Sequence, residues 1–369
     1  MKLLVRPPHY LIPQYSLTGD ILSYLRCGLQ YRYLNGSALP PSRPVQQWFG
    51  EFIHGIMEEA FKTYRESSLP PWPEEDIQAI CERIEKRLAV VGKSPRNQNL
   101  RQIAYARAKL AINELGPHLF PLIAMSEVRL SATDKMPQMP GVQFRSKHFE
   151  IRGVVDVLTK VSLYQFCGEN PLLGLLREEV SFKVSQKDFE VIVDYKGMRR
   201  PSTHDEIWDY LEWQINTYAW LRMMQPDSNR VIAGVLIFIN EFLPSKEDLA
   251  ELQDEIKADL TDVIPSTGSE ELRKITKWNK NDEVPELSLD FRFRRAIRIV
   301  KVNRQTIMRS LQKFKDVVKD IELCVLNEKV RGSILQTWPK KPDDKTCTAC
   351  DFDSFCPRLK KLIRAPKAP

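Results

Sequence analysis

The chain has 369 residues, 43% of them hydrophobic, which is enough apolar material for one large core or two ordinary ones. No run of about 18 apolar residues marks a membrane span, and the first residues lack the apolar region and cleavage site of a signal peptide. Seven cysteines, an odd number unevenly spread, do not form a secreted disulfide framework, so we expect a cytoplasmic protein.

The formal net charge of +7 is concentrated in one segment. Residues 291–309 contain seven Lys and Arg and no acidic residue, which leaves 48 basic and 48 acidic residues in the remaining chain. Such a run is either a solvated face or a contact with a phosphate backbone. On the second interpretation, we expect nucleic acid to contact Arg292, Arg294, Arg295, Arg298, Lys301 and Arg304.

Helical patterns dominate the first third of the chain. Residues 17–34 begin with capping signals and predict a short helix. Residues 45–66 repeat apolar side chains with helical period and contain His54. After a Pro-rich break, roughly residues 74–116 are helical with an interruption near GKSPRN, whose Gly-Lys-Ser lacks the first glycine of a P-loop.

Strand patterns begin near residue 120. Four segments are rich in Val, Ile and Phe, and the last is apolar enough for a buried strand: 120–131, 147–163, 189–196 and 230–240. Helices are predicted at 205–225, 246–260 and 303–330, with a polar connection over 262–290. Residues 165–188 and 241–290 are interpreted as insertions. This order predicts an α/β sandwich with a mixed central sheet flanked by helices, not a doubly wound parallel sheet.

Three charged residues occupy strand segments. Asp156 lies near the end of one apolar strand, and Asp194 and Lys196 lie two residues apart on another, so both project from one face. Two carboxylates converging from adjacent strands are held ionised best by a divalent cation. Mg²⁺ or Mn²⁺ there would polarise a phosphate oxygen and lower the pKa of a bound water, and Lys196 would orient that water or neutralise the transition state.

Each of these residues also has a structural interpretation. Asp194 and Lys196 fit an exposed ion pair at a strand end, and Asp156 fits a strand-capping carboxylate. His54 fits a half-buried helix histidine, and Gln214 and Tyr218 fit a polar pair on an amphipathic helix.

Four cysteines lie at the two ends of the chain. Cys27 is near the N-terminus, and Cys347, Cys350 and Cys356 form a C-x2-C-x5-C motif. Four thiolates fill the coordination of one iron–sulfur cluster or one Zn²⁺, and spacing alone does not separate the two. Unrelated thiols are the remaining interpretation, which we apply to Cys81, Cys167 and Cys324 as buried or incidental residues.

The order of these motifs resembles the RecB-like branch of the PD-(D/E)XK nuclease superfamily, particularly its iron–sulfur members. These are the CRISPR-associated exonucleases of spacer acquisition and the nuclease domains of AddB-type recombination proteins. The family pattern G-x-x-x-H, G-x-x-D, D-x-K and Q-x-x-x-Y is matched by Gly50 to His54, Gly153 to Asp156, Asp194 to Lys196 and Gln214 to Tyr218. With the cysteines, the resemblance spans about residues 16–357.

The resemblance implies a role for each matched position. His54, Asp156 and Asp194 would bind the catalytic metal with the backbone carbonyl of Tyr195, and Lys196 would be the catalytic lysine. Gln214 and Tyr218 would position the lysine or the DNA strand, and Glu127 would be an outer carboxylate of lower rank. The four cysteines would hold a [4Fe–4S] cluster that staples residue 27 to residues 347–356.

We therefore expect one restriction-endonuclease-like domain over residues 1–369, with residues 67–116 as a helical insertion. The expected activity is a metal-dependent deoxyribonuclease, an exonuclease on single-stranded or end-containing DNA in repair, recombination or CRISPR adaptation. No helicase motor is apparent, so the expected partners are DNA and a helicase or CRISPR adaptation protein. The alternative is a non-cleaving nucleic-acid-binding scaffold subunit.

Overall fold

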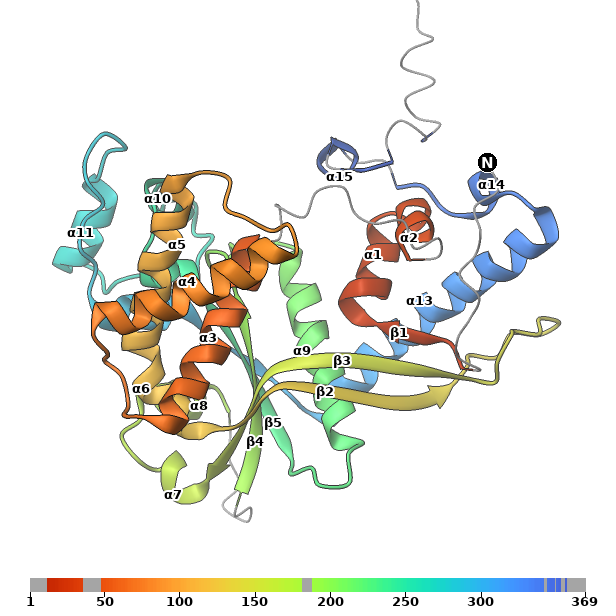
Figure 1. Ribbon diagram of the computed structural model, residues 1–369, viewed down its shortest axis with the longest axis horizontal. Helices are drawn as coiled ribbons and strands as arrows, with labels where there is room; N and C mark the ends of the chain where they lie inside the picture. The colour runs from red at the N-terminus through yellow and green to blue at the C-terminus, as the bar shows by residue number, and fades with distance from the viewer. Residues whose placement is uncertain are drawn as a thin grey trace, which may run out of the picture. The chain divides into compact units, whose positions relative to one another are not determined.

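The computed structural model describes residues 12–35, 48–180, 188–341, 344–348, 350–352 and 356 (Figure 1). The chain forms two compact units. The first comprises Met1–Arg43, Leu130–Gly153 and Gln305–Pro369, and the second comprises Pro44–Arg129 and Val154–Arg304. Within the described ranges, no helix is both long and apolar enough to cross a membrane.

A mixed sheet forms the centre of the second unit. Strand β3 (His148–Ser162) runs antiparallel to β4 (Asp188–Lys196), β4 runs parallel to β5 (Val231–Phe238), and β5 runs antiparallel to β6 (Ile297–Lys301). β2 (Ile123–Lys135) pairs with β3. Every residue of β5 is buried, as its unbroken apolar sequence requires. The mixed sheet expected from the sequence is confirmed.

The two faces of β4 pack against different helices. Its odd-numbered side chains from Phe189 to Tyr195 join the main hydrophobic cluster together with α3 (Trp48–Glu66). Two even-numbered side chains bond instead to α9 (Ile207–Met223): Glu190 pairs with Arg222, and Lys196 donates to Gln214, both at 2.8 Å. This alternation, which follows from the two-residue period of a strand, places helices on both faces of the sheet.

The remaining helices of the second unit precede β2, follow β3 or follow β5. Those before β2 are α4 (Glu74–Val90), α5 (Gln98–Leu110), η3 (Ala111–Leu115), α6 (Gly116–Leu119) and η4 (Phe120–Leu122). The later ones are α7 (Leu163–Phe166), α8 (Pro171–Glu179), η5 (Ile239–Phe242), α10 (Lys246–Ala258), α11 (Glu270–Lys277) and α12 (Leu289–Ala296). The helical stretch interrupted near GKSPRN is thus confirmed. Of the expected insertion at 165–188, residues 181–187 lie outside the described residues.

The expected polar connection over residues 262–290 is wrong in its centre, where α11 forms. Ile275 is the residue of α11 that is buried, so the apolar pattern is short, but Ser269 caps the helix by accepting from Leu272 N. Ile275 and Trp278 nevertheless pack with Leu249, Leu287 and Phe291 in a small cluster of their own. Local capping signals and these tertiary contacts together stabilise this helix.

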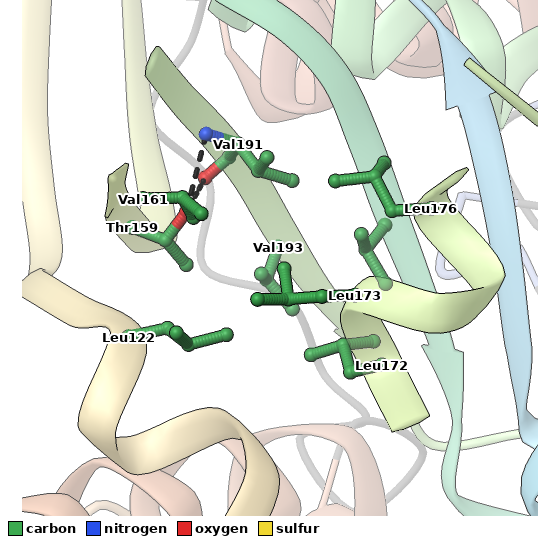
Figure 2. A pocket seen from close by; sticks show the side chains of 9 residues that line it. Leu122, Thr159, Val161, Leu172, Leu173, Leu176, Val191 and Val193 are labelled. Atoms are coloured by element: carbon green, nitrogen blue, oxygen red, sulfur yellow. Dashed lines mark hydrogen bonds between the residues drawn. The ribbon is translucent and has the colours of Figure 1, made fainter. Parts of the chain in front are cut away.

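A small apolar cavity lies between α8 and the sheet (Figure 2). Leucines of α8 line it from one side, and Val191 and Val193 of β4 line it from the other. The hydroxyl of Thr159 donates to Val191 O at 3.1 Å and accepts from Val191 N at 3.2 Å. Because this hydroxyl is already satisfied, the cavity is a packing feature between helix and sheet.

The first unit joins distant parts of the chain. It contains β1 (Gln14–Ser16), which pairs parallel with β3, followed by η1 (Leu17–Ile21), α1 (Leu22–Arg26) and α2 (Gly28–Leu34). Its C-terminal part holds most of α13 (Arg304–Arg331), then α14 (Ile334–Thr337) and α15 (Asp344–Thr348). The single helix expected over 17–34 is corrected, because Cys27 adopts an extended conformation with φ of −163° and separates α1 from α2.

Gly234, in the middle of β5, lets α9 approach the sheet closely. A Cβ atom at this position would lie 2.2 Å from Ile215 Cγ2 of α9. We expect Gly234→Ala to lower the free energy of unfolding by about 1–3 kcal/mol, because the added methyl overpacks a filled interface. Urea denaturation followed by circular dichroism measures this change.

Two further variants test the cause. Ile215→Ala combined with Gly234→Ala makes room for the methyl, so the double variant should lose less stability than the sum of the single changes. Gly50→Ala is the control, because a Cβ there meets no atom within 4 Å. A Gly234→Ala protein as stable as Gly50→Ala would show that this close approach is not required.

Candidate active site

The register of β3 and β4 sets the distance between the two aspartates. Pairing begins at Val157 opposite Val193, so Asp156 and Asp194 face each other one residue beyond the paired segment. Opposed residues of antiparallel strands point to the same face of the sheet. Asp156 Oδ2 accepts a hydrogen bond from Tyr195 N at 2.9 Å. The carboxylate therefore bonds to the backbone of β4 where the strand ladder ends.

Helix α3 adds His54 to this pair. His54 Nδ1 lies 3.1 Å from Asp156 Oδ2, and the imidazole is 33% exposed. Its neighbours Phe52, Ile53 and Ile56 are buried and anchor the helix. One ligand atom each of His54, Asp156 and Asp194 lies within 4.8 Å of the others. This set of one imidazole and two carboxylates fits a divalent cation.

Burial and neighbouring charges shift the three groups in different directions. Burial raises the pKa of Asp194 to about 6, a shift that Asp156 reinforces and Lys196 opposes. Burial would also raise the pKa of Asp156, but the hydrogen bond and charge of His54 outweigh it, and the net shift is downward. Burial lowers the pKa of His54, yet its bond to Asp156 makes the net shift upward. A cation would relieve the repulsion between the two carboxylates.

A chain of hydrogen bonds extends from the aspartates to α9. Lys196 Nζ donates to Asp194 Oδ2 and to Gln214 Oε1, both at 2.8 Å. Gln214 Nε2 donates to the Tyr218 hydroxyl at 3.1 Å. Because an ammonium group only donates, the lysine fixes which side of the Gln214 amide faces it. Burial raises the pKa of Tyr218. The structure thus places all six residues of the expected constellation in one network, while their roles stay predictions.

Two further carboxylates lie near this network. Burial raises the pKa of Glu127, and the charges of Asp156 and Glu58 raise it further. Glu127 also has φ of 51°, a left-handed conformation that is unusual for a residue within a strand. Sequence reasoning did not single out Glu58, although its position one helical turn after His54 on α3 was a usable signal.

The expected basic strip is largely neutralised in the structure. It forms α12 and β6, and two of its arginines serve the fold. Arg295 is buried against Glu241, with Nε 2.7 Å from Oε2, and Arg292 makes two bonds to Glu114 at 2.9 and 3.0 Å. Their assignment to nucleic-acid contact is therefore corrected, because these guanidinium groups are already bonded to carboxylates inside the unit.

The other members of the strip lie nearer the surface. Arg298 bonds to Asp262 at 2.7 Å and lies over the Trp208 ring. Arg294 pairs with Glu178 and Lys301 with Glu179, at 3.3 and 3.2 Å. Arg304 is exposed. Nucleic-acid contact stays a prediction for Arg294, Arg298, Lys301 and Arg304.

The four cysteines of the two chain ends all belong to the first unit. Burial raises the pKa of the Cys350 thiol, and the nearby sulfur atoms of Cys27, Cys356 and Cys347 raise it further. The backbone of α2 is bonded to the segment before the cysteine motif, through Leu29 N to Pro339 O at 3.0 Å. Of the other cysteines, Cys81 and Cys324 are buried and Cys167 is exposed.

Part of the chain matches the model of a known protein family. Residues 19–164 match the family model of the PD-(D/E)XK nuclease superfamily. The matched segment includes His54 and Asp156 and ends before Asp194, so it covers two of the six residues of the network. Nucleases of this superfamily use divalent metals, which the His54, Asp156 and Asp194 group could bind. The match supports a metal-dependent phosphodiester hydrolase that binds DNA. No curated protein matches the chain.

A divalent cation should stabilise the protein through these three residues. Saturating Mn²⁺ should raise the melting temperature of the wild type, since a ligand at 100 times its Kd adds about 2.7 kcal/mol. Asp194→Asn should abolish this increase without lowering the metal-free melting temperature, because it removes repulsion with Asp156. Differential scanning calorimetry with and without Mn²⁺ measures both quantities.

Asp188→Asn is the matched control, at the other end of β4 in an exposed pair with Lys160. It should keep the full Mn²⁺ response. An equal response in Asp194→Asn would place the cation elsewhere.

Proposed function

We propose that the protein is a metal-dependent DNA exonuclease of the RecB-like iron–sulfur branch, acting on single-stranded or end-containing DNA in repair, recombination or CRISPR adaptation. The observation that carries the proposal is the continuous network from His54 through the two aspartates and Lys196 to α9. Attack from strand ends is the mode that the resemblance to this branch implies.

The residues at the site divide the chemistry between them. A bound Mg²⁺ or Mn²⁺ would supply a Lewis acid and lower the pKa of a water molecule. His54, Asp156 and Asp194 would hold it. Lys196 presents its ammonium group beside Asp194, where it would stabilise negative charge that develops on the scissile phosphate. Gln214 holds the ammonium in place through its amide oxygen, and Tyr218 fixes the amide in turn.

The second part of the proposal assigns a [4Fe–4S] cluster to Cys27, Cys347, Cys350 and Cys356. The proximity of Cys27, Cys347 and Cys356 to Cys350, which adds to the effect of burial in raising the pKa of the Cys350 thiol, supports one shared site. Four thiolates fit either one zinc ion or one cluster. The resemblance to the iron–sulfur branch is what favours the cluster.

Removing a metal-binding carboxylate or the lysine should abolish cleavage while leaving DNA binding intact. We expect Asp194→Asn and Lys196→Ala each to lower the rate on labelled single-stranded DNA with Mn²⁺ by about 100-fold or more. Time-resolved gel analysis of a strand labelled at one end measures the rate and separates cleavage from the ends from internal cleavage.

Lys160→Ala is the matched control, because this lysine lies exposed on β3 in a surface pair with Asp188. Full activity is expected there. Unchanged cleavage in both site variants would contradict the assignment. A wild type that binds DNA but never cuts it would point to the scaffold alternative.

The cluster is tested separately from cleavage. Protein purified without oxygen should contain about four iron atoms per chain and absorb near 400 nm, as thiolate-bound iron–sulfur centres do. Cys347→Ala and Cys27→Ala should each lose iron and absorbance, whereas Cys167→Ala, which changes an exposed cysteine of the other unit, should keep both. Stoichiometric zinc in place of iron would contradict the cluster.

A further inference from the structure

The connection between α4 and α5 carries a second concentration of positive charge. We call residues 86–101 the α4–α5 tip. It contains five Lys and Arg residues and no Asp or Glu. Lys93 and Arg101 pair with carboxylates of α3 and α4. Lys86, Arg87 and Arg96 are exposed, and no described carboxylate lies within ion-pair distance of them. The α4–α5 tip therefore presents free cations, unlike the neutralised strip at α12 and β6.

Apolar side chains stand among these cations. Val90 is 87% exposed, Val91 is 61% exposed, and Leu100 across the connection is 42% exposed. Isolated exposed apolar residues are ordinary, but three together on a cationic tip form a mixed surface. Phosphates match the cations, and the faces of unpaired bases match the apolar side chains. Bases stacked inside a duplex offer no such faces, so a single strand fits this surface better.

The backbone of the α4–α5 tip is fixed at both ends. Gly92 has φ of 77°, and the bonds Gly92 N to Ala89 O and Lys93 N to Leu88 O close the end of α4 in a Schellman motif. The side chain of Asn97 then caps the start of α5 by accepting from Leu100 N at 2.9 Å. The backbone that carries the exposed valines and cations is thus ordered before any ligand binds, which reduces the entropy lost on binding.

Lys93 connects the α4–α5 tip to the helix that carries His54. Its ammonium group forms an ion pair with Glu51 of α3, one helical turn before His54. This ion pair brings the tip beside the N-terminal turn of α3. The tip and the network of Asp156, Asp194 and Lys196 belong to the same unit. A DNA strand bound along the tip would therefore be held by the unit that carries this network.

We propose that the α4–α5 tip is a binding surface for single-stranded DNA that guides the strand toward the metal-binding network. This proposal rests on the proposed nuclease function for its purpose, although the binding itself does not require cleavage. Lys86, Arg87 and Arg96 contact the phosphates, and Val90 and Val91 contact the bases.

The combined variant Lys86→Ala, Arg87→Ala and Arg96→Ala tests the electrostatic part. Binding of a fluorescein-labelled oligothymidine to the full chain is followed by anisotropy in EDTA, so that nothing is cleaved, across a series of salt concentrations. Each phosphate contact contributes about 0.7 to the slope of log Kd against log salt. We expect the slope to fall by about 2 and the affinity at low salt to fall by about 10-fold or more.

The matched control removes three lysines from α11 and the residues after it, in the same unit: Lys274→Ala, Lys277→Ala and Lys280→Ala. This control changes the net charge by the same amount. It should bind with the wild-type slope, and a tip variant that behaves like it would overturn the proposal. A wild-type protein that binds single-stranded DNA through the tip but does not cleave it would contradict the proposed nuclease function. That result would not contradict the binding surface proposed here.

Val90→Ser with Val91→Ser tests the apolar part, because both positions are exposed and all charges are kept. The salt slope should be unchanged, while the preference for the single strand over a duplex of the same length should fall several-fold. An undiminished preference would overturn the assignment of the bases to the valines.

Discussion

The repulsion between two carboxylates is the constraint on which the candidate site depends. The β3–β4 register forces Asp156 and Asp194 to face each other one residue past the paired segment. The protein compensates with a hydrogen bond from Tyr195 N, the contact with His54 and the ammonium group of Lys196. His54 comes from α3, and Gln214 of α9 holds the Lys196 ammonium group, so both helical layers must pack on the sheet before the two charges are tolerated. The same arrangement gives the site its affinity for a divalent cation.

The close packing of α9 on the sheet extends this constraint to residues that never touch the carboxylates. Gly234 removes a side chain where Ile215 approaches β5. Gln214, the residue before Ile215, accepts its bond from Lys196. A shift of α9 would therefore change the position of the lysine as well as the core. The contact between Ile215 and β5 at Gly234 therefore affects both the stability of the core and the position of Lys196. In this way a glycine in a buried strand helps to determine the geometry of the site.

The sequence predicts β2 to β5 and the grouping of the constellation, because both rest on local signals, whereas β1 and β6 were not predicted. The two-residue period placed Asp194 and Lys196 on one face, and the helical period placed Gln214 beside Tyr218. Two of the predictions that were wrong are the free charge of Arg292 and Arg295 and the polar connection over 262–290. Both segments contact residues that are remote in the sequence. The arginines of the strip look free until Glu114 and Glu241 are seen beside them. The helix over 270–277 has one buried residue, although Ser269 caps it and its first turn is acidic, which were usable local signals. Composition gives the number of charged residues. Ion pairing in the folded protein determines which of those charges remain free to bind a ligand.

The first unit is assembled from both ends of the chain, which affects how it is made. Tyr15 bonds to Glu322, and Arg32 bonds to Glu328 at 2.7 and 2.8 Å. These partners are separated by 307 and 296 residues. On the ribosome, the N-terminal strand and helices must therefore wait for α13 to emerge, while the second unit, complete by Arg304, is already free to fold. The aspartates and lysine of the network are synthesised and folded first, and the unit that joins the two termini is completed last.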